Sequence, residues 1–148
     1  MIRRATPADR DAVERIITEA YAVYIGRMGK PPGPMLNDYG ALIAAGTVHV
    51  LKPDDQPIAA VIVLLEKADH LLLDNIAVRR DRQGQGLGRQ LIAFVEDEAR
   101  RLGFAEIRLY THVTMVENIA LYMRLGFVET GRGRDGGYDR VFMAKGLG

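Results

Sequence analysis

Apolar residues recur along the chain with two different periods, and these periods predict its helices and strands. A spacing of three or four residues indicates an amphipathic helix that begins at Thr6 and extends to about Tyr24, and another over 87–102 that ends before Gly103. Short runs that are continuously apolar, or that alternate with polar residues, are typical of strands. The predicted strands are 2–5, 48–51, 58–66, 71–78, 107–112, 127–130 and 140–144.

Further helices and irregular connections complete the pattern. The segment 26–34 is rich in proline and glycine, so we expect an irregular connection there, followed by a short helix over about 37–45. Thr114 and Glu117 have the spacing of a capping box, which predicts that the last helix starts at Thr114. Glycines recur over 131–137 and predict a loop between the two closing strands.

The order of these elements is strand, two helices, three strands, helix, strand, helix and two strands. This order predicts a mixed α/β fold. A chain of 148 residues can bury roughly two-thirds of its unfolded surface around one core and is too short for two ordinary domains. We therefore expect a single domain over residues 1–148.

Composition narrows the classes of function. Lys and Arg number 20 against 19 Asp and Glu, so a formal net charge of +1 gives no overall field that favours nucleic acid or an anionic membrane. Cysteine is absent, which excludes disulfides, a thiol nucleophile and thiolate metal sites, and we expect no metal. The longest apolar run, 58–65, is far shorter than a membrane span, and no signal-peptide pattern opens the chain, so we expect a cytoplasmic protein.

The most informative stretch is Gln83-Gly84-Gln85-Gly86-Leu87-Gly88, which joins the strand 71–78 to the helix 87–102. A helix that opens in glycine leaves unpaired N–H groups at its positive end, and the missing Cβ atoms let phosphate oxygens approach the backbone. Four arginines add positive charge to the same loop: Arg79, Arg80, Arg82 and Arg89. The pattern predicts a phosphate-binding loop, while a plain surface turn ahead of a core helix is the alternative.

The spacing of the glycines selects among phosphate ligands. A Walker A loop requires Lys and Ser or Thr after its last glycine, but Arg89 and Gln90 follow Gly88. A dinucleotide fingerprint requires glycine or alanine where Arg89 stands. The pattern Gln83-x-x-Gly86-x-Gly88 instead resembles the acetyl-CoA signature of the GNAT N-acetyltransferase superfamily.

A second motif supports this resemblance. Leu121-Tyr122-Met123-Arg124-Leu125-Gly126-Phe127 is similar to the ending of the later motif of the superfamily, with one helix and one strand between the two motifs. The resemblance implies an α/β fold with a central, mostly antiparallel mixed sheet, flanked by about four helices. It also implies that the strand ending at Val78 and the strand 107–112 form one parallel pair that splays apart.

The resemblance implies acetyl-CoA as the cosubstrate. The pantetheine arm would lie between the splayed strands and pair with main-chain groups, as an added strand would, while the glycine loop would take the pyrophosphate. The residues expected to bind the cofactor are Ile76, Ala77, Val78, Gln83, Gly84, Gln85, Gly86, Leu87, Gly88, Arg89, Asn118 and Tyr122. Asn118 enters this set because Met115 stands where the superfamily often has a pantetheine-contacting asparagine.

Acetyl transfer to an amine needs a neutral amine, a stabilised oxyanion and a proton for the leaving thiolate. Tyr122 matches the usual acid tyrosine of the superfamily, and a packing tyrosine is the alternative. Main-chain N–H groups near Ile76 could hold the oxyanion. The base stays open between His112, Asp74 and a water chain, because Leu72 and Tyr110 occupy positions where some relatives carry Glu.

The acceptor is expected to contact the first helical hairpin and the last strand hairpin. Candidate substrate residues are Tyr24, Arg27, Tyr110 and Arg134. The cations Arg27, Lys30, Arg132 and Arg134 favour an amine that also carries an anionic group.

The sequence therefore predicts an N-acetyltransferase that transfers acetyl from acetyl-CoA to a primary amine by direct attack in a ternary complex, with a small amine metabolite as acceptor. A protein N-terminal or lysine acetyltransferase, and a catalytically silent acyl-CoA sensor or partner module, are the alternatives. We expect no nucleic-acid or membrane partner, and a homodimer is compatible with the sequence.

Overall fold

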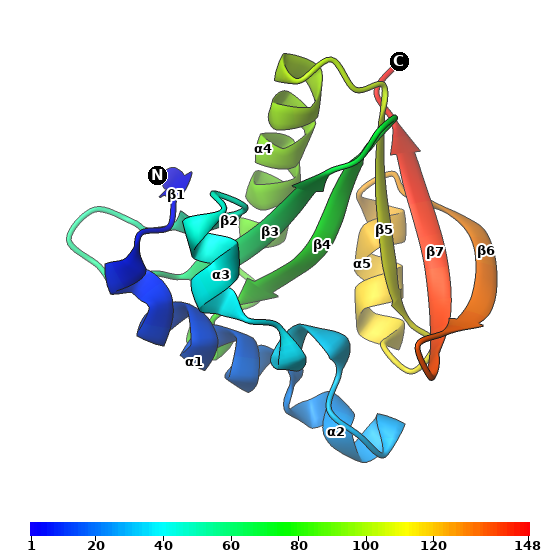
Figure 1. Cartoon of the computed structure of the whole chain (residues 1–148), viewed down its shortest axis with the longest axis horizontal. Coiled ribbons are helices and arrows are strands. Elements are labelled where there is room, and N and C mark those ends of the chain that lie inside the picture. The colour runs from blue at the N-terminus through cyan, green and yellow to red at the C-terminus, as the bar shows by residue number, and fades with distance from the viewer.

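The computed structural model describes residues Met1–Gly148, and seven strands form one sheet in the order β1-β2-β3-β4-β5-β7-β6 (Figure 1). The strands are β1 (Ile2–Arg4), β2 (Val48–Leu51), β3 (Ala60–Glu66), β4 (Leu71–Val78), β5 (Glu106–His112), β6 (Val128–Asp135) and β7 (Tyr138–Gly146). Every neighbouring pair is antiparallel except β4 and β5. The mixed, mostly antiparallel sheet expected from the sequence is confirmed.

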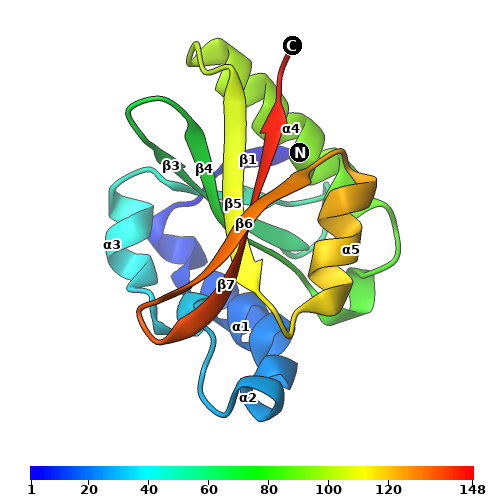
Figure 2. The same ribbon diagram turned by 90° about the vertical axis from the view of Figure 1, so that its right-hand side faces the viewer.

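Five α-helices cover the sheet. They are α1 (Arg10–Tyr21), α2 (Val23–Met28), α3 (Tyr39–Ala44), α4 (Leu87–Arg101) and α5 (Val116–Arg124), with short 3₁₀ turns at Pro7–Asp9, Gly33–Leu36 and Arg80–Arg82. Helices α4 and α5 lie on one side of the sheet, and α1 and α3 lie on the other (Figures 1 and 2). No helix has the length and apolar character needed to cross a bilayer.

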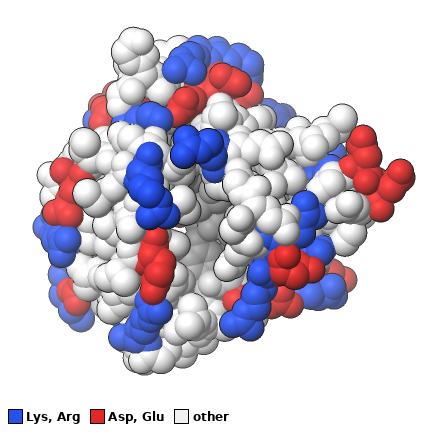
Figure 3. Space-filling view, turned by 180° about the vertical axis from the view of Figure 1, so that it is seen from behind, with Lys and Arg blue, Asp and Glu red and all other residues white.

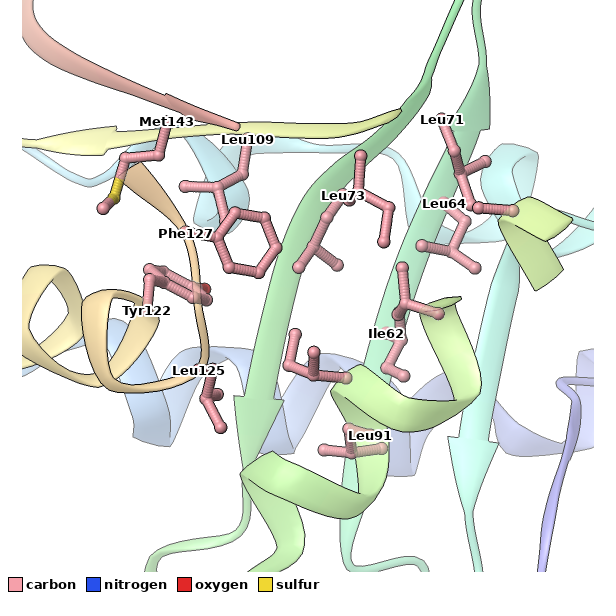
Figure 4. Packing of buried hydrophobic residues seen from close by; sticks show 14 of the residues in the cluster. Ile62, Leu64, Leu71, Leu73, Leu91, Leu109, Tyr122, Leu125, Phe127 and Met143 are labelled. Carbon is pink, nitrogen blue, oxygen red and sulfur yellow. The ribbon is translucent and has the colours of Figure 1, made fainter. Parts of the chain in front are cut away.

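The buried residues of β3 explain this layered arrangement. Successive strand residues point to opposite faces of a sheet. Ile62 accordingly packs into the cluster beneath α4 and α5, while Val61 and Val63 pack into the cluster beneath α1 and α3. Figure 4 shows the first cluster, in which Leu91 of α4 and Tyr122 of α5 approach the same sheet face. The sheet is therefore held between two apolar layers.

The parallel pair β4–β5 is short. Its register covers only three positions, from Leu71 opposite Ile107 to Leu73 opposite Leu109. A β-bulge begins at this point, because Leu73 pairs with Leu64 and Asn75 pairs with Val63, which leaves Asp74 of β4 without a partner. A bulge bends its strand and strengthens the local twist. Beyond Leu73 the two strands diverge, as the resemblance implied.

Two of the predicted helix boundaries are wrong. Residues 26–28 are helical, because α2 continues to Met28 and ends only where Gly29 takes a left-handed φ of 75°. The last helix begins at Val116 rather than at Thr114. The hydroxyl of Thr114 lies 2.9 Å from Nδ1 of His112 instead of capping the helix.

The predicted glycine-rich loop over 131–137 is also wrong. β6 continues to Asp135 and β7 begins at Tyr138, so only Gly136 and Gly137 form the turn. Both glycines have positive φ, 58° and 82°, as a two-residue hairpin turn of type I′ requires. The other glycines of this segment lie within a paired strand, where tertiary pairing overrides their low strand propensity.

Candidate active site

Two cavities meet where β4 separates from β5. The larger one, of about 700 Å³, is bordered by α1, α2, the end of β4, the glycine loop and α5. The smaller one, of about 170 Å³, is bordered by the β4 bulge, the end of β5, the start of β7 and the segment that follows α2. Three residues line both cavities: Tyr21, Asn118 and Tyr122. A ligand in either cavity therefore reaches the same junction.

The main chain of β4 turns polar groups toward the larger cavity. The N–H of Arg79 donates to the carbonyl of Ala59 at 2.8 Å, and an antiparallel ladder alternates between hydrogen-bonded and open pairs. By this alternation Ala77 faces β3, whereas Ile76 and Val78 point their N–H and C=O groups away from it. Strand β5 does not pair with this part of β4. The two residues thus form an open strand edge.

Side chains confirm the direction of this edge. The hydroxyl of Tyr21 donates to the carbonyl of Ile76 at 3.0 Å, and Nε2 of Gln83 donates to the carbonyl of Val78 at 3.2 Å. Both carbonyls are thereby satisfied by the protein. The N–H groups at the same edge are the ones to which an extended ligand can add hydrogen bonds.

The glycine loop opens the larger cavity toward the start of α4. Gly86 is the N-cap of this 15-residue helix with φ 78°, and Gly84 has φ 79°. A Cβ atom at either position would meet no protein atom within 4 Å, so the space over the backbone is open. At Gly88 a Cβ would lie 3.7 Å from Cδ2 of Leu121, which places α4 and α5 in close approach. The unpaired N–H groups of the first turn of α4 are accessible from the cavity.

Arginines give this cavity an excess of positive charge. Arg27 is neutralised by Glu117 at 2.8 Å. Four other arginines line the cavity without an ion pair: Arg80, Arg82, Arg89 and Arg124. On the face turned away from the viewer in Figure 1, Lys and Arg side chains lie around a hollow (Figure 3). The larger cavity combines open helix N–H groups with unpaired cations and is suited to an anionic ligand.

The residues predicted to bind the cofactor are brought together by the fold. All of them line the larger cavity except Gln85. The side-chain oxygen Oε1 of Gln85 accepts instead from Nε of Arg82 at 2.7 Å. Met115, at the position where an asparagine is common, faces the smaller cavity, and Asn118 stands at the junction.

Tyr122 occupies the junction of the two cavities. Its side chain is only 6% exposed, and its ring meets Phe127 edge-on with the centroids 5.8 Å apart. The hydroxyl makes no hydrogen bond to another group of the protein. Burial raises the pKa of Tyr122, with the neighbouring Tyr24 as a smaller cause. The phenol therefore keeps its proton at neutral pH and is free to donate it.

Tyr21 is a junction residue that the sequence analysis assigned only to an apolar helix stripe. Burial raises the pKa of Tyr21 well above its usual value, so its hydroxyl is a permanent donor to Ile76. The sequence signal for this role was only that residue 21 is a tyrosine, because a buried tyrosine hydroxyl usually needs a hydrogen-bond partner. The periodicity that identifies the stripe carries no information about that partner.

Asp74 stands at the β4 bulge and lines the smaller cavity. Its carboxylate accepts from Nδ2 of Asn37 and of Asn75, both at 3.3 Å, and from the hydroxyl of Tyr110 at 3.5 Å. Burial first, and the carboxylate of Asp74 second, raise the pKa of Tyr110. Asn75 is 4% exposed, and its Oδ1 has no hydrogen-bond partner. This end of the cavity is rich in acceptor oxygens.

His112 also lines the smaller cavity, but its ring is engaged. The backbone N–H of Thr114 donates to Nδ1 at 3.2 Å, which assigns the proton of the neutral ring to Nε2. Burial lowers the pKa of His112, although Asp139 acts in the opposite direction. In this arrangement the nitrogen with a free lone pair points back to its own chain rather than to a ligand.

The predicted substrate residues are divided by the fold. Tyr110 lines the smaller cavity, Tyr24 and Arg27 line the larger one, and Arg134 lines neither. Residues of the smaller cavity that sequence reasoning missed include Asn75, Tyr138 and Arg140. They come from separate segments with no shared motif, so no local signal marks them.

The four cations expected at the acceptor entrance are already paired. Arg27 contacts Glu117, and its Nη1 also donates to the carbonyl of Thr114 at 3.1 Å, which ties α2 to the start of α5. Lys30 donates to the carbonyl of Gly137. The remaining two form ion pairs within their own hairpin, Arg132 with Glu129 at 3.0 Å and Arg134 with Asp139 at 3.1 Å. None of the four lines the smaller cavity, so the structure lends no support to their recognition of an anionic acceptor, which stays a prediction.

A sequence model of the acetyltransferase (GNAT) family matches residues 12–127, which include the glycine loop and Tyr122. The chain belongs to the GNAT family. The structural findings agree with this membership, since the splayed strands and the glycine loop border one cavity. The matched residues include all those that line the larger cavity and most of those that line the smaller one.

Relatives of this GNAT chain are similar to it in sequence over only part of its length. The [ribosomal protein bS18]-alanine N-acetyltransferase of Escherichia coli K12 is 40% identical over 82 residues, which cover 51% of this chain and 55% of that protein. Human N-acetyltransferase 8B is 34% identical over 87 residues, 59% of this chain and 35% of that protein. The matched stretch thus spans about half the length of the bacterial relative.

Solved structures match over the whole chain. The ribosomal-protein-S18-alanine N-acetyltransferase from Escherichia coli superposes with a TM-score of 0.75 at 28% identity and covers 99% of this chain and 93% of that one. The PaiA N-acetyltransferase from Thermoplasma acidophilum, solved in complex with coenzyme A, gives 0.81 at 17% identity and covers 99% and 98%. The second likeness establishes the fold alone.

Proposed function

We propose that the protein is an acetyl-CoA-dependent N-acetyltransferase in which a primary amine attacks the thioester directly in a ternary complex. The observation that carries this proposal is the meeting of two cavities at Tyr122. One cavity has the charge and open backbone suited to a CoA-like ligand, and the other has the size and polarity of a small acceptor site. Direct transfer needs both substrates to reach one point.

The larger cavity holds acetyl-CoA in this proposal. The N–H groups of Ile76 and Val78 bind amides of the pantetheine arm as an added strand would. The first turn of α4 binds the pyrophosphate, where Gly84 and Gly86 leave room over the backbone. The unpaired arginines at the rim neutralise the remaining phosphate charge. Two structures with the same fold were solved with coenzyme A or acetyl-CoA, which supports CoA as the type of ligand.

Tyr122 acts as the general acid. The amine attacks the thioester carbonyl, the C–N bond forms, and the C–S bond breaks with its electron pair left on sulfur. A phenol that burial keeps protonated can donate to that sulfur and be reprotonated from solvent. The N–H of Ile76 is the candidate donor to the oxyanion of the tetrahedral intermediate.

Asp74 is the better candidate than His112 for accepting the amine proton. Its carboxylate lines the smaller cavity at the bulge directly before the open edge of β4. His112 already uses Nδ1 to accept the N–H of Thr114. An alkylamine has a pKa of about 10.4, so at neutral pH a carboxylate also attracts the cation before it loses its proton.

A small amine metabolite is the acceptor that the smaller cavity fits. Its volume of about 170 Å³ lies below the roughly 300–1,000 Å³ of sites for drug-sized ligands, so it admits a compact group. A protein N-terminus is the second candidate, because one terminal residue is also compact. The full-length structural match to the Escherichia coli S18-alanine N-acetyltransferase favours this second candidate.

Two measurements test the proposal. Acetyl-CoA at 100 times its dissociation constant should add about 2.7 kcal/mol to the free energy of unfolding and raise Tm, whereas ATP and NAD should not. Release of free thiol from acetyl-CoA should then depend on an added amine. Stabilisation by acetyl-CoA without release for any amine would identify a silent sensor, and stabilisation by ATP or NAD alone would reject the CoA site.

A further inference from the structure

Arg140 is the one arginine or lysine that lines the smaller cavity, and its position is unusual for a surface cation. Its guanidinium carbon lies 4.1 Å from the ring centroid of Tyr110 and 5.3 Å from that of Tyr138. The side chain is only 18% exposed. Two aromatic rings thus hold a planar cation in place before any ligand arrives, which lowers the entropic cost of using it in binding.

The hydrogen-bonding capacity of Arg140 is not used within the protein. Its Nε is buried and has no hydrogen-bond partner. The only acid near it is Asp135, 3.4 Å from Nε, and that carboxylate is 70% exposed, so solvent weakens the pair. A guanidinium with free donors in a fixed fork is the arrangement that recognises a carboxylate or another planar anion.

Hydrogen-bond acceptors, rather than donors, lie near the hydroxyl end of Tyr110. Its hydroxyl contacts Asp74, and the neighbouring Asn75 presents the unpartnered oxygen Oδ1. The smaller cavity therefore offers acceptor oxygens near the junction and a cation over the face of the same tyrosine ring. A ligand that satisfies both ends carries an ammonium group and an anionic group a short distance apart.

We propose that Arg140 determines acceptor specificity by binding an anionic group on the amine substrate, so that the preferred acceptors are amino acids or compact amines with a carboxylate. This inference rests on the proposed acetyltransferase function and narrows its substrate class. It assigns the anion-binding role to a residue of β7 whose side chain lines the cavity, rather than to the paired cations of the two hairpins. A peptide N-terminus lacks the adjacent carboxylate and is the weaker ligand.

The test compares pairs of acceptors that differ only in the anion. Initial rates are measured with alanine and alaninamide, and with β-alanine and β-alaninamide, for the unchanged protein and for Arg140→Gln and Arg140→Lys. The unchanged protein should prefer each amino acid, and Arg140→Gln should raise KM for the amino acid by about 10- to 100-fold, as expected for a lost charge-assisted hydrogen bond. Arg140→Lys keeps the charge and should retain part of the preference.

Arg108→Gln is the matched control, because Arg108 lies on the adjacent strand β5 and pairs with Glu106 outside both cavities. It should leave the preference unchanged, and the affinity for acetyl-CoA verifies that every variant is folded. Equal use of amino acid and amide, or an intact preference in Arg140→Gln, would overturn the inference while the acetyltransferase stands. Absence of acceptor-dependent thiol release with every amine, peptides included, would instead reject the proposed function.

Discussion

The two cavities that meet at Tyr122 are built on different principles. About half of the residues that border the larger one come from the continuous stretch 76–89, which contains the glycine loop, and α1, α2 and α5 supply most of the others. The smaller one is formed by side chains from separate parts of the chain, among them Asn37, Asp74, Tyr110 and Arg140. A backbone conformation that requires glycine can be recognised as a motif in the sequence. A group of side chains from distant parts of the chain cannot.

This difference follows from what each cavity has to recognise. Phosphates and amides are bound well by N–H groups, which every non-proline residue carries, so position matters more than side-chain type. A small acceptor is distinguished by charges and hydrogen-bonding groups that only side chains supply. The larger cavity accordingly has the family signature, and in the proposed function the smaller cavity determines which acceptor is used. Three substitutions test how separate the two are, and a fourth lies outside both.

Tyr122→Phe should have the largest effect, because it acts at the junction. The change removes only the hydroxyl and keeps the packing against Phe127. Loss of a general acid typically lowers kcat by about 100- to 10,000-fold, while the dissociation constant of acetyl-CoA should stay within a few-fold. Steady-state kinetics and calorimetric titration measure the two quantities. An unchanged kcat with a good acceptor would remove Tyr122 from the mechanism.

Gly86→Ala should affect the larger cavity alone. Gly103, just past the end of α4, supplies a matched control, because its φ of 83° is close to the 78° of Gly86 and both positions are open. Each alanine should cost roughly 1–2 kcal/mol of stability through the left-handed backbone. Only Gly86→Ala should also weaken acetyl-CoA binding, by about tenfold or more. Equal binding by the two variants would contradict a phosphate site at this loop.

Asp74→Asn should act on the smaller cavity. It keeps the shape of the side chain and removes the charge, so kcat/KM for the amine should fall by about 10- to 100-fold. Binding of acetyl-CoA should be unaffected, because Asp74 does not line the larger cavity. His112→Gln serves as the comparison and should cost less. A larger loss in His112→Gln would return the proton-accepting role to the imidazole.

His49→Leu should have the smallest effect and lies outside both cavities. His49 is 8% exposed beside Phe94, and burial lowers its pKa. Below the usual pKa of about 6.5 the unfolded chain takes up a proton that the native state resists, so the free energy of unfolding decreases from pH 7 to pH 5. The variant should show a smaller decrease in urea titrations at the two pH values. An equal decrease would assign the pH dependence to other groups.

The sequence by itself determined the elements whose signals are local. Strands β2 and β4 have the predicted bounds, and glycine spacing located the start of α4, because periodicity and backbone freedom act within a few residues. The motif around Tyr122 also placed that residue in the cavity that holds the glycine loop. These inferences required no knowledge of which segments lie side by side.

Only the tertiary structure decided the features that depend on distant partners. Thr114 fits a capping box by spacing, yet its hydroxyl contacts His112. Gly131 and Gly133 predict a loop, yet pairing with β7 keeps both in a strand. Arg140 gives no signal in the sequence, and its proposed role depends on its stacking on Tyr110 across β5 and β7. Pairing, burial and ion pairing act between residues far apart in the chain, so the acceptor end of the site was decided by the fold.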